Sequence, residues 1–207
     1  GPLDAGCRYT ITESPDPIAK KQRLKPSPDF IKVKLVADAI HHEKPFDDFL
    51  EQPLLPWKQS QMGPGIAWAD IDGDGDEDFY LSQGAGTAGA LYFQQENKTF
   101  KSASPGPIAN EMASEDMAPL FFDADKDGRL DLLITSGSNE QPTGDESYRD
   151  RLYLGVEGGQ GFAPAYFLPG DPISSSTAVV ADVDHDGDLD LFIGGRLIPG
   201  KWPTSPG

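Results

Sequence analysis

Short apolar segments alternate with polar segments over residues 62–196. Three times along this stretch, an apolar segment leads into an aspartate-rich one, and a second apolar segment follows. The apolar segments are rich in β-branched and aromatic residues and are bounded by glycine and aspartate, a pattern that predicts strands rather than helices. They are residues 65–69, 79–81, 118–122, 132–135, 177–181 and 191–194.

The first two repeats each continue with two more matching segments. Residues 90–93 correspond to 151–154, and residues 99–100 correspond to 161–162. Each repeat therefore predicts four strands. The aspartate-rich segments begin at residues 70, 123 and 182, and four-stranded units repeated at roughly 50 residues are typical of β-propeller blades.

The third repeat has only its first two predicted strands. The pattern therefore predicts an all-β fold of about two and a half propeller blades, and a fragment of a larger propeller, because closed propellers have about 4–8 blades. We expect the open blade edges to pair with the rest of the propeller or with another chain. The predicted division is an N-terminal arm over residues 1–60, blade 1 over 61–110, blade 2 over 111–170 and an incomplete blade 3 over 171–207.

The N-terminal arm has its own pattern. Prolines among charged residues over 11–28 predict an extended linker, residues 30–36 alternate like one outer strand, and a helical turn is expected near residues 46–50. The segment around Cys7 is similar to the end of a bacterial lipoprotein signal, although Asp4 stands where an apolar residue is usual. A lipid anchor on Cys7 and an inert thiol are the two alternatives.

The net charge and the lengths of the apolar runs limit the kinds of partner that this chain is expected to bind. The 207 residues carry a formal net charge of −17, which argues against binding nucleic acid because its phosphates would be repelled. The sequence contains no apolar run of about 18 residues, so no transmembrane segment is expected. Six, four and five of the 34 acidic residues lie in the three aspartate-rich segments. The chain is therefore expected to hold cations.

The three segments share the pattern D-x-D-x-D-G-x-x-D. Carboxylates at positions 1, 3 and 5 can converge if the chain curls tightly, and glycine at position 6 permits that curl. Calcium takes about 6–8 oxygen ligands, so a carbonyl at position 7 and the aspartate at position 9 would complete the shell. An EF-hand needs a glutamate at position 12. Position 12 is apolar in all three loops, as Leu81, Ile134 and Ile193, which excludes that alternative.

This combination of strands and loops resembles the FG-GAP/VCBS repeats of integrin-α-like propellers. Gly63-Pro64 before the first strand and the Leu91-Tyr92 and Leu152-Tyr153 pairs are similar to bacterial proteins related to cartilage acidic protein, which often carry an ASPIC/UnbV segment. The resemblance implies about three structural Ca²⁺ ions, one per blade. The implied ligands are Asp70, Asp72, Asp74, Asp76 (carbonyl) and Asp78; Asp123, Asp125, Asp127, Arg129 (carbonyl) and Asp131; and Asp182, Asp184, Asp186, Asp188 (carbonyl) and Asp190.

The resemblance favours an exported, extracellular or periplasmic module that binds a protein or glycan, in adhesion or as a scaffold, and is not itself an enzyme. One alternative is a propeller module of a larger extracellular hydrolase or lyase, and another is a structural piece of a large assembly. The pair His41-His42 is expected to serve at the surface or in packing, and Trp68, Phe121 and Phe122 are expected in the core. The polar loop over residues 136–149 is either a ligand-facing loop or a mobile insertion.

Overall fold

The computed structural model describes residues 39–104 and 106–204. In this part of the chain the only α-helix is α1 (Asp48–Glu51), close to the predicted helical turn, and two short 3-10 helices, η1 (Gly106–Glu111) and η2 (Glu146–Tyr148), interrupt the strands. The predicted outer strand at residues 30–36 and the thiol of Cys7 lie outside the described residues.

The strands form three antiparallel sheets, each in sequence order. The first sheet contains β1 (Ile66–Ala69), β2 (Asp78–Leu81), β3 (Ala90–Gln94) and β4 (Phe100–Ser102). The second contains β5 (Asp116–Phe122), β6 (Asp131–Ser136), β7 (Arg151–Tyr153) and β8 (Tyr166–Phe167). The third contains β9 (Ser174–Ala181) and β10 (Asp190–Leu197). The prediction for residues 161–162 was wrong, because Phe162 forms only an isolated bridge to Gly155 and the fourth strand begins at Tyr166.

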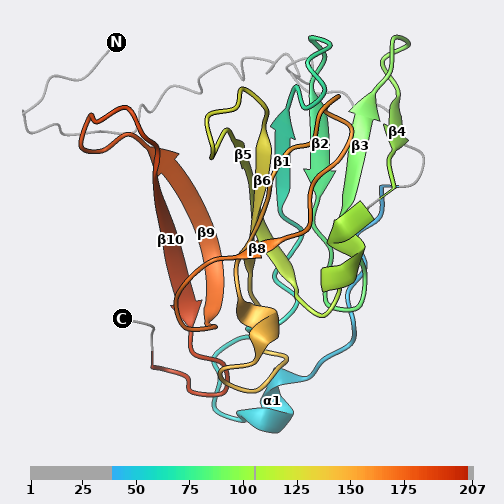
Figure 1. Cartoon of the computed structure of the whole chain (residues 1–207). Helices are drawn as coiled ribbons and strands as arrows, with labels where there is room; N and C mark the ends of the chain where they lie inside the picture. The colour runs from blue at the N-terminus through green and yellow to red at the C-terminus, as the bar shows by residue number, and fades with distance from the viewer. Residues whose placement is uncertain (1–38, 105, 205–207) are drawn as a thin grey trace, which may run out of the picture. The chain divides into compact units, whose positions relative to one another are not determined.

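The three sheets lie beside one another in sequence order (Figure 1), with β1 next to β5 and β5 next to β9. Adjacent first strands are the arrangement of neighbouring blades in a propeller, so the predicted all-β fold of propeller-like blades is confirmed. The β1–β2, β5–β6 and β9–β10 hairpins all turn at the same end of the sheets, whereas α1 lies at the opposite end. The three aspartate-rich segments therefore share one end of the blades.

The main core lies between the first two sheets. A buried polar network joins them, since Tyr80 donates a hydrogen bond to Asp116 at 2.6 Å and Arg151 pairs with the other oxygen of Asp116 at 2.7 Å. All three residues are at most 3% exposed. The apolar core residues around them are Ile71, Leu91, Phe93, Ile108, Leu132, Ile134, Tyr153 and Phe162.

The expectation that Trp68 lies in the core was wrong. Its side chain is 51% exposed and packs on Phe79 and Phe100 on the outer face of the first sheet. Phe121, on the inner side, is partly buried against the main core. Successive residues of a strand face opposite sides of the sheet, and Trp68 lies on the side of a second, smaller apolar cluster, whose buried members are Phe79, Leu81 and Tyr92.

Candidate metal centres

The three aspartate-rich loops curl through the same backbone conformation. The glycine at position 6 has a positive φ in every loop, with values of +90°, +85° and +91° for Gly75, Gly128 and Gly187. Its amide donates a hydrogen bond to the carboxylate at position 1 in each loop, at 2.9–3.1 Å. The first aspartate therefore closes the curl by accepting this hydrogen bond, and the glycine permits the curl because a residue without a Cβ adopts this φ without a steric clash.

Position 4 is a second left-handed residue that the sequence analysis missed. Gly73 occupies it in the first loop, but Lys126 and His185 occupy it in the other two, each with a φ of +63°. Glycine at this position in the first loop was the one sequence signal for it. A lysine or histidine in this conformation is uncommon, so the fold of these loops imposes the same geometry on unlike side chains.

Carboxylates converge in all three loops. In each loop, three of the predicted side chains offer oxygens that lie within 4.8 Å of one another. One buried oxygen each of Asp72 and Asp182 has no hydrogen-bond partner. Burial, together with repulsion from Asp74 and Asp70, raises the pKa of Asp72. The convergent sets are Asp70, Asp72 and Asp78; Asp123, Asp125 and Asp127; and Asp182, Asp184 and Asp190.

These sets fit a hard divalent cation. Every donor is a carboxylate oxygen, which is the ligand type that calcium and magnesium prefer. Clustered carboxylates with an unpartnered buried oxygen repel one another, and a cation at their centre would relieve that repulsion. Several acidic clusters of this chain are therefore able to bind metal ions.

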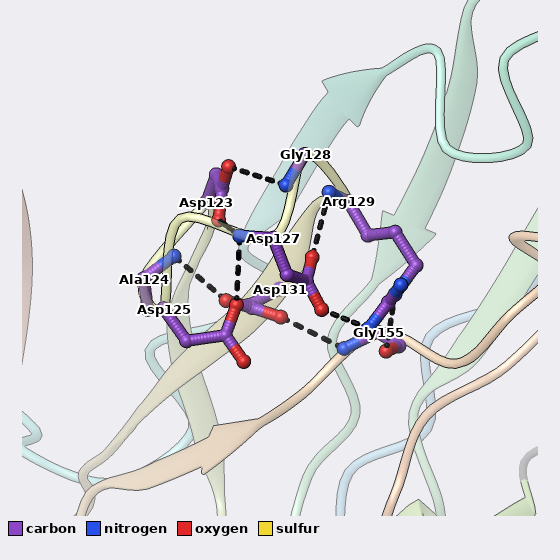
Figure 2. Close-up of polar contacts among 8 residues, drawn as sticks. All are labelled: Asp123, Ala124, Asp125, Asp127, Gly128, Arg129, Asp131 and Gly155. Atoms are coloured by element: carbon purple, nitrogen blue, oxygen red, sulfur yellow. Dashed lines mark hydrogen bonds and ion pairs between the residues drawn. The ribbon is translucent and has the colours of Figure 1, made fainter.

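The aspartate at position 9 has a role that the sequence analysis did not predict. Figure 2 shows Asp131 accepting hydrogen bonds from the amides of Ala124, at 2.7 Å, and Gly155, at 2.8 Å. Its side chain is fully buried. In the first repeat Asp78 likewise accepts from Ile71 and Gln94, at 3.1 and 2.8 Å. In these two repeats the carboxylate at position 9 thus links the loop, through hydrogen bonds, to the end of the third strand of its blade.

Several predicted side chains stay outside the convergent sets. Asp76 and Asp188, at position 7, pair with Lys98 and Lys126, so only their carbonyls are available for the predicted ligand role, which stays a prediction. Asp127 belongs to its set but also pairs with Arg129, as Figure 2 shows. The predicted side chains not in a set are Asp74, Asp131 and Asp186.

Comparison with known proteins finds a family match to part of the chain. A family model described as FG-GAP-like repeat matches residues 70–134, from the start of the first aspartate-rich loop to β6. This match supports an FG-GAP repeat in that part of the chain. No curated protein matches the sequence. None of the helices in the described part has the length and apolar character that a membrane crossing requires.

Proposed function

We propose, from the FG-GAP-like repeat and the geometry of its loops, that this chain is a calcium-stabilised, exported and non-catalytic propeller module that binds protein or glycan. The observation that carries the proposal is the convergence of three carboxylates in each of three loops. The loops stand at the same end of three adjacent hairpins. One ion in each loop would hold the first two strands of a blade together.

Calcium is the proposed ion because the loops offer many oxygens without an octahedral frame. Magnesium demands near-ideal octahedral geometry and retains several waters, whereas calcium accepts 6–8 oxygens in flexible arrangements. Three bound ions would change the formal net charge from −17 to about −11. Binding free energy at such sites adds to folding free energy.

Export is part of the proposal because calcium is plentiful outside the cell. Extracellular calcium modules commonly bind with dissociation constants near 10⁻⁴–10⁻³ M, so millimolar extracellular calcium would keep even modest sites filled. The Gly63-Pro64 and Leu-Tyr segments support kinship with bacterial proteins related to cartilage acidic protein. The exposed apolar side chains of Trp68 and Phe192, 51% and 66% exposed, support a further partner for the outer sheet faces.

A binding role is supported by the end of the blades opposite the aspartate-rich loops. The loop between β6 and β7 borders a cleft of about 360 Å³ through Tyr148 and Arg149, and a second cleft of about 290 Å³ through Asn139 and Gln141. Loops on a rigid sheet scaffold are common places for ligand contacts.

Equilibrium dialysis against calcium tests the metal part of the proposal. The wild-type chain should retain at least three ions, and Asp72→Asn should retain one fewer than the wild type. Asp76→Asn is the matched control, because the Asp76 side chain pairs with Lys98 and lies outside the convergent set. A wild-type chain that binds no calcium at millimolar concentration, or equal losses in both variants, contradicts the proposal.

A further inference from the structure

A fourth acidic cluster lies at the end of the blades opposite the aspartate-rich loops. It contains Glu43 from the segment before α1, Glu115 from the residue before β5, and Glu140 from the loop between β6 and β7. Each offers a carboxylate oxygen, and these oxygens lie within 4.8 Å of one another. The three residues are far apart in the sequence and follow no aspartate-loop pattern, so the fold alone brings them together.

Four of the six carboxylate oxygens in this cluster are buried without a hydrogen bond. Glu115 is only 2% exposed, and neither of its carboxylate oxygens has a hydrogen-bond partner. One oxygen each of Glu43 and Glu140 is also buried and unpartnered. Among the described residues, none of the three forms an ion pair with lysine or arginine. Unpaired buried carboxylates are costly, so this cluster calls for a cation or protons.

Burial and mutual repulsion raise the pKa of two members of the cluster. Burial, followed by repulsion from Glu115 and Glu43, raises the pKa of Glu140 to about 7. Burial and repulsion from Glu43 raise the pKa of Glu115. The nearby Ser138 hydroxyl and Met62 amide act in the opposite direction, although neither lies in hydrogen-bonding geometry with the carboxylate. The Ser138 hydroxyl is itself buried without a hydrogen bond, so it does not satisfy the carboxylate.

His41 holds one member of the cluster in place. Its Nδ1 lies 2.9 Å from the carbonyl of Ser82, and its Nε2 lies 2.5 Å from Glu43. A carbonyl only accepts, so Nδ1 carries a proton and the imidazole is oriented by this bond. A Cβ on Gly63 would lie 2.8 Å from the His41 ring, and one on Gly84 would lie 2.4 Å from the Glu43 carboxylate. The two glycines therefore make the space that this pair occupies.

We propose that Glu43, Glu115 and Glu140 together bind one divalent cation at a site separate from the aspartate-rich loops. The all-carboxylate donor set suits a hard ion such as Ca²⁺ or Mn²⁺. His41 acts as the outer partner that orients Glu43, as second-layer residues do around metal ligands. Glu140 also lines the 290 Å³ cleft beside Phe46 and Pro199, which gives the ion a route from solvent.

Crystals of the wild-type chain soaked in Mn²⁺ test the site without any substitution. The anomalous difference map should show a peak among the three glutamates, in addition to any peaks in the aspartate-rich loops. Peaks in the loops with none at the glutamates overturn this inference and leave the proposed function intact. A peak at the glutamates with none in the loops contradicts the proposed function and supports this inference.

Mn²⁺ titrations followed by electron paramagnetic resonance give the matching test in solution. Glu140→Gln should bind one Mn²⁺ fewer, or bind it at least tenfold more weakly, and His41→Ala should weaken that ion by about 10–100-fold. Glu146→Gln, in the same loop but exposed and paired with Arg149, should bind as the wild type does. An unchanged Mn²⁺ count in folded Glu140→Gln overturns the inference, and if that variant does not fold, the wild-type soak decides.

Discussion

Replacing Asp131 by asparagine separates the structural role of the second loop from its metal role. Asp131 is fully buried, and its two carboxylate oxygens accept from the amides of Ala124 and Gly155. Asparagine retains the shape but has one acceptor oxygen, and its NH₂ group would face a backbone N–H. The variant should therefore be destabilised even when no metal ion is present.

The size of the effect follows from these two hydrogen bonds. A hydrogen bond to a charged group contributes about 1.5–3 kcal/mol, and an unsatisfied buried donor costs about 1–3 kcal/mol. Ala124 is exposed, so water can hydrate its amide if that bond is lost. We expect Asp131→Asn to lower the free energy of unfolding by about 2–4 kcal/mol.

Urea unfolding in EDTA measures this loss, and Asp127→Asn in the same loop is the control. The Asp127 side chain is 24% exposed and pairs with Arg129. Asparagine keeps an oxygen for the Arg129 amide, so this substitution should cost less than about 1 kcal/mol without calcium. On adding calcium, Asp127→Asn should gain less stability than the wild type, because Asp127 belongs to the convergent set. Equal losses for the two variants in EDTA would refute the structural role of position 9.

Three further predictions concern the rest of the described chain. Asp116→Ala should lower the free energy of unfolding by about 3–5 kcal/mol, because Arg151 is left buried without its partner, and a double-mutant cycle with Tyr80→Phe should show coupling. Burial opposes ionisation of Asp48, but hydrogen bonds led by that from Ser60 lower its pKa overall. The ionised Asp48 carboxylate therefore stabilises the fold above about pH 4, and this stabilisation is lost below it. The Asp48→Asn variant should accordingly show a flatter dependence of unfolding on pH between about pH 5 and 3. Gly128→Ala should cost about 1–2 kcal/mol in thermal unfolding, since no atom lies within 4 Å of the added Cβ and only the φ of +85° opposes it.

The repeated strands and the curl of the loops were predictable from the sequence, because both depend on local patterns. Short apolar segments rich in β-branched and aromatic residues, and a glycine at position 6, express backbone preferences within a few residues. The exposure of Trp68 was not predictable in the same way. Its strand has the expected apolar pattern, but burial depends on which face another sheet covers, and that is set by packing between repeats.

The candidate metal sites differ in the same way, because one kind has local ligands and the other has ligands that are distant in the sequence. The aspartate-rich loops could be predicted because their ligands lie within nine residues of one another in the sequence. The glutamate cluster could not be predicted, because Glu43 comes from the segment before α1, and Glu115 and Glu140 come from two separate loops of the second blade, which only the folded chain brings within reach of one another. Glu43 follows His41 by two residues, but nothing in the sequence indicated that they would meet Glu115 and Glu140.

The dependence of stability on free calcium tests the central claim most directly. In the Glu140→Gln variant, where only the aspartate-rich loops should bind, the free energy of unfolding should rise by about 4 kcal/mol per tenfold rise in free calcium above the dissociation constants, or about 1.4 kcal/mol for each of three ions. A free energy of unfolding and a melting curve that are the same in EDTA and in millimolar calcium would contradict the account.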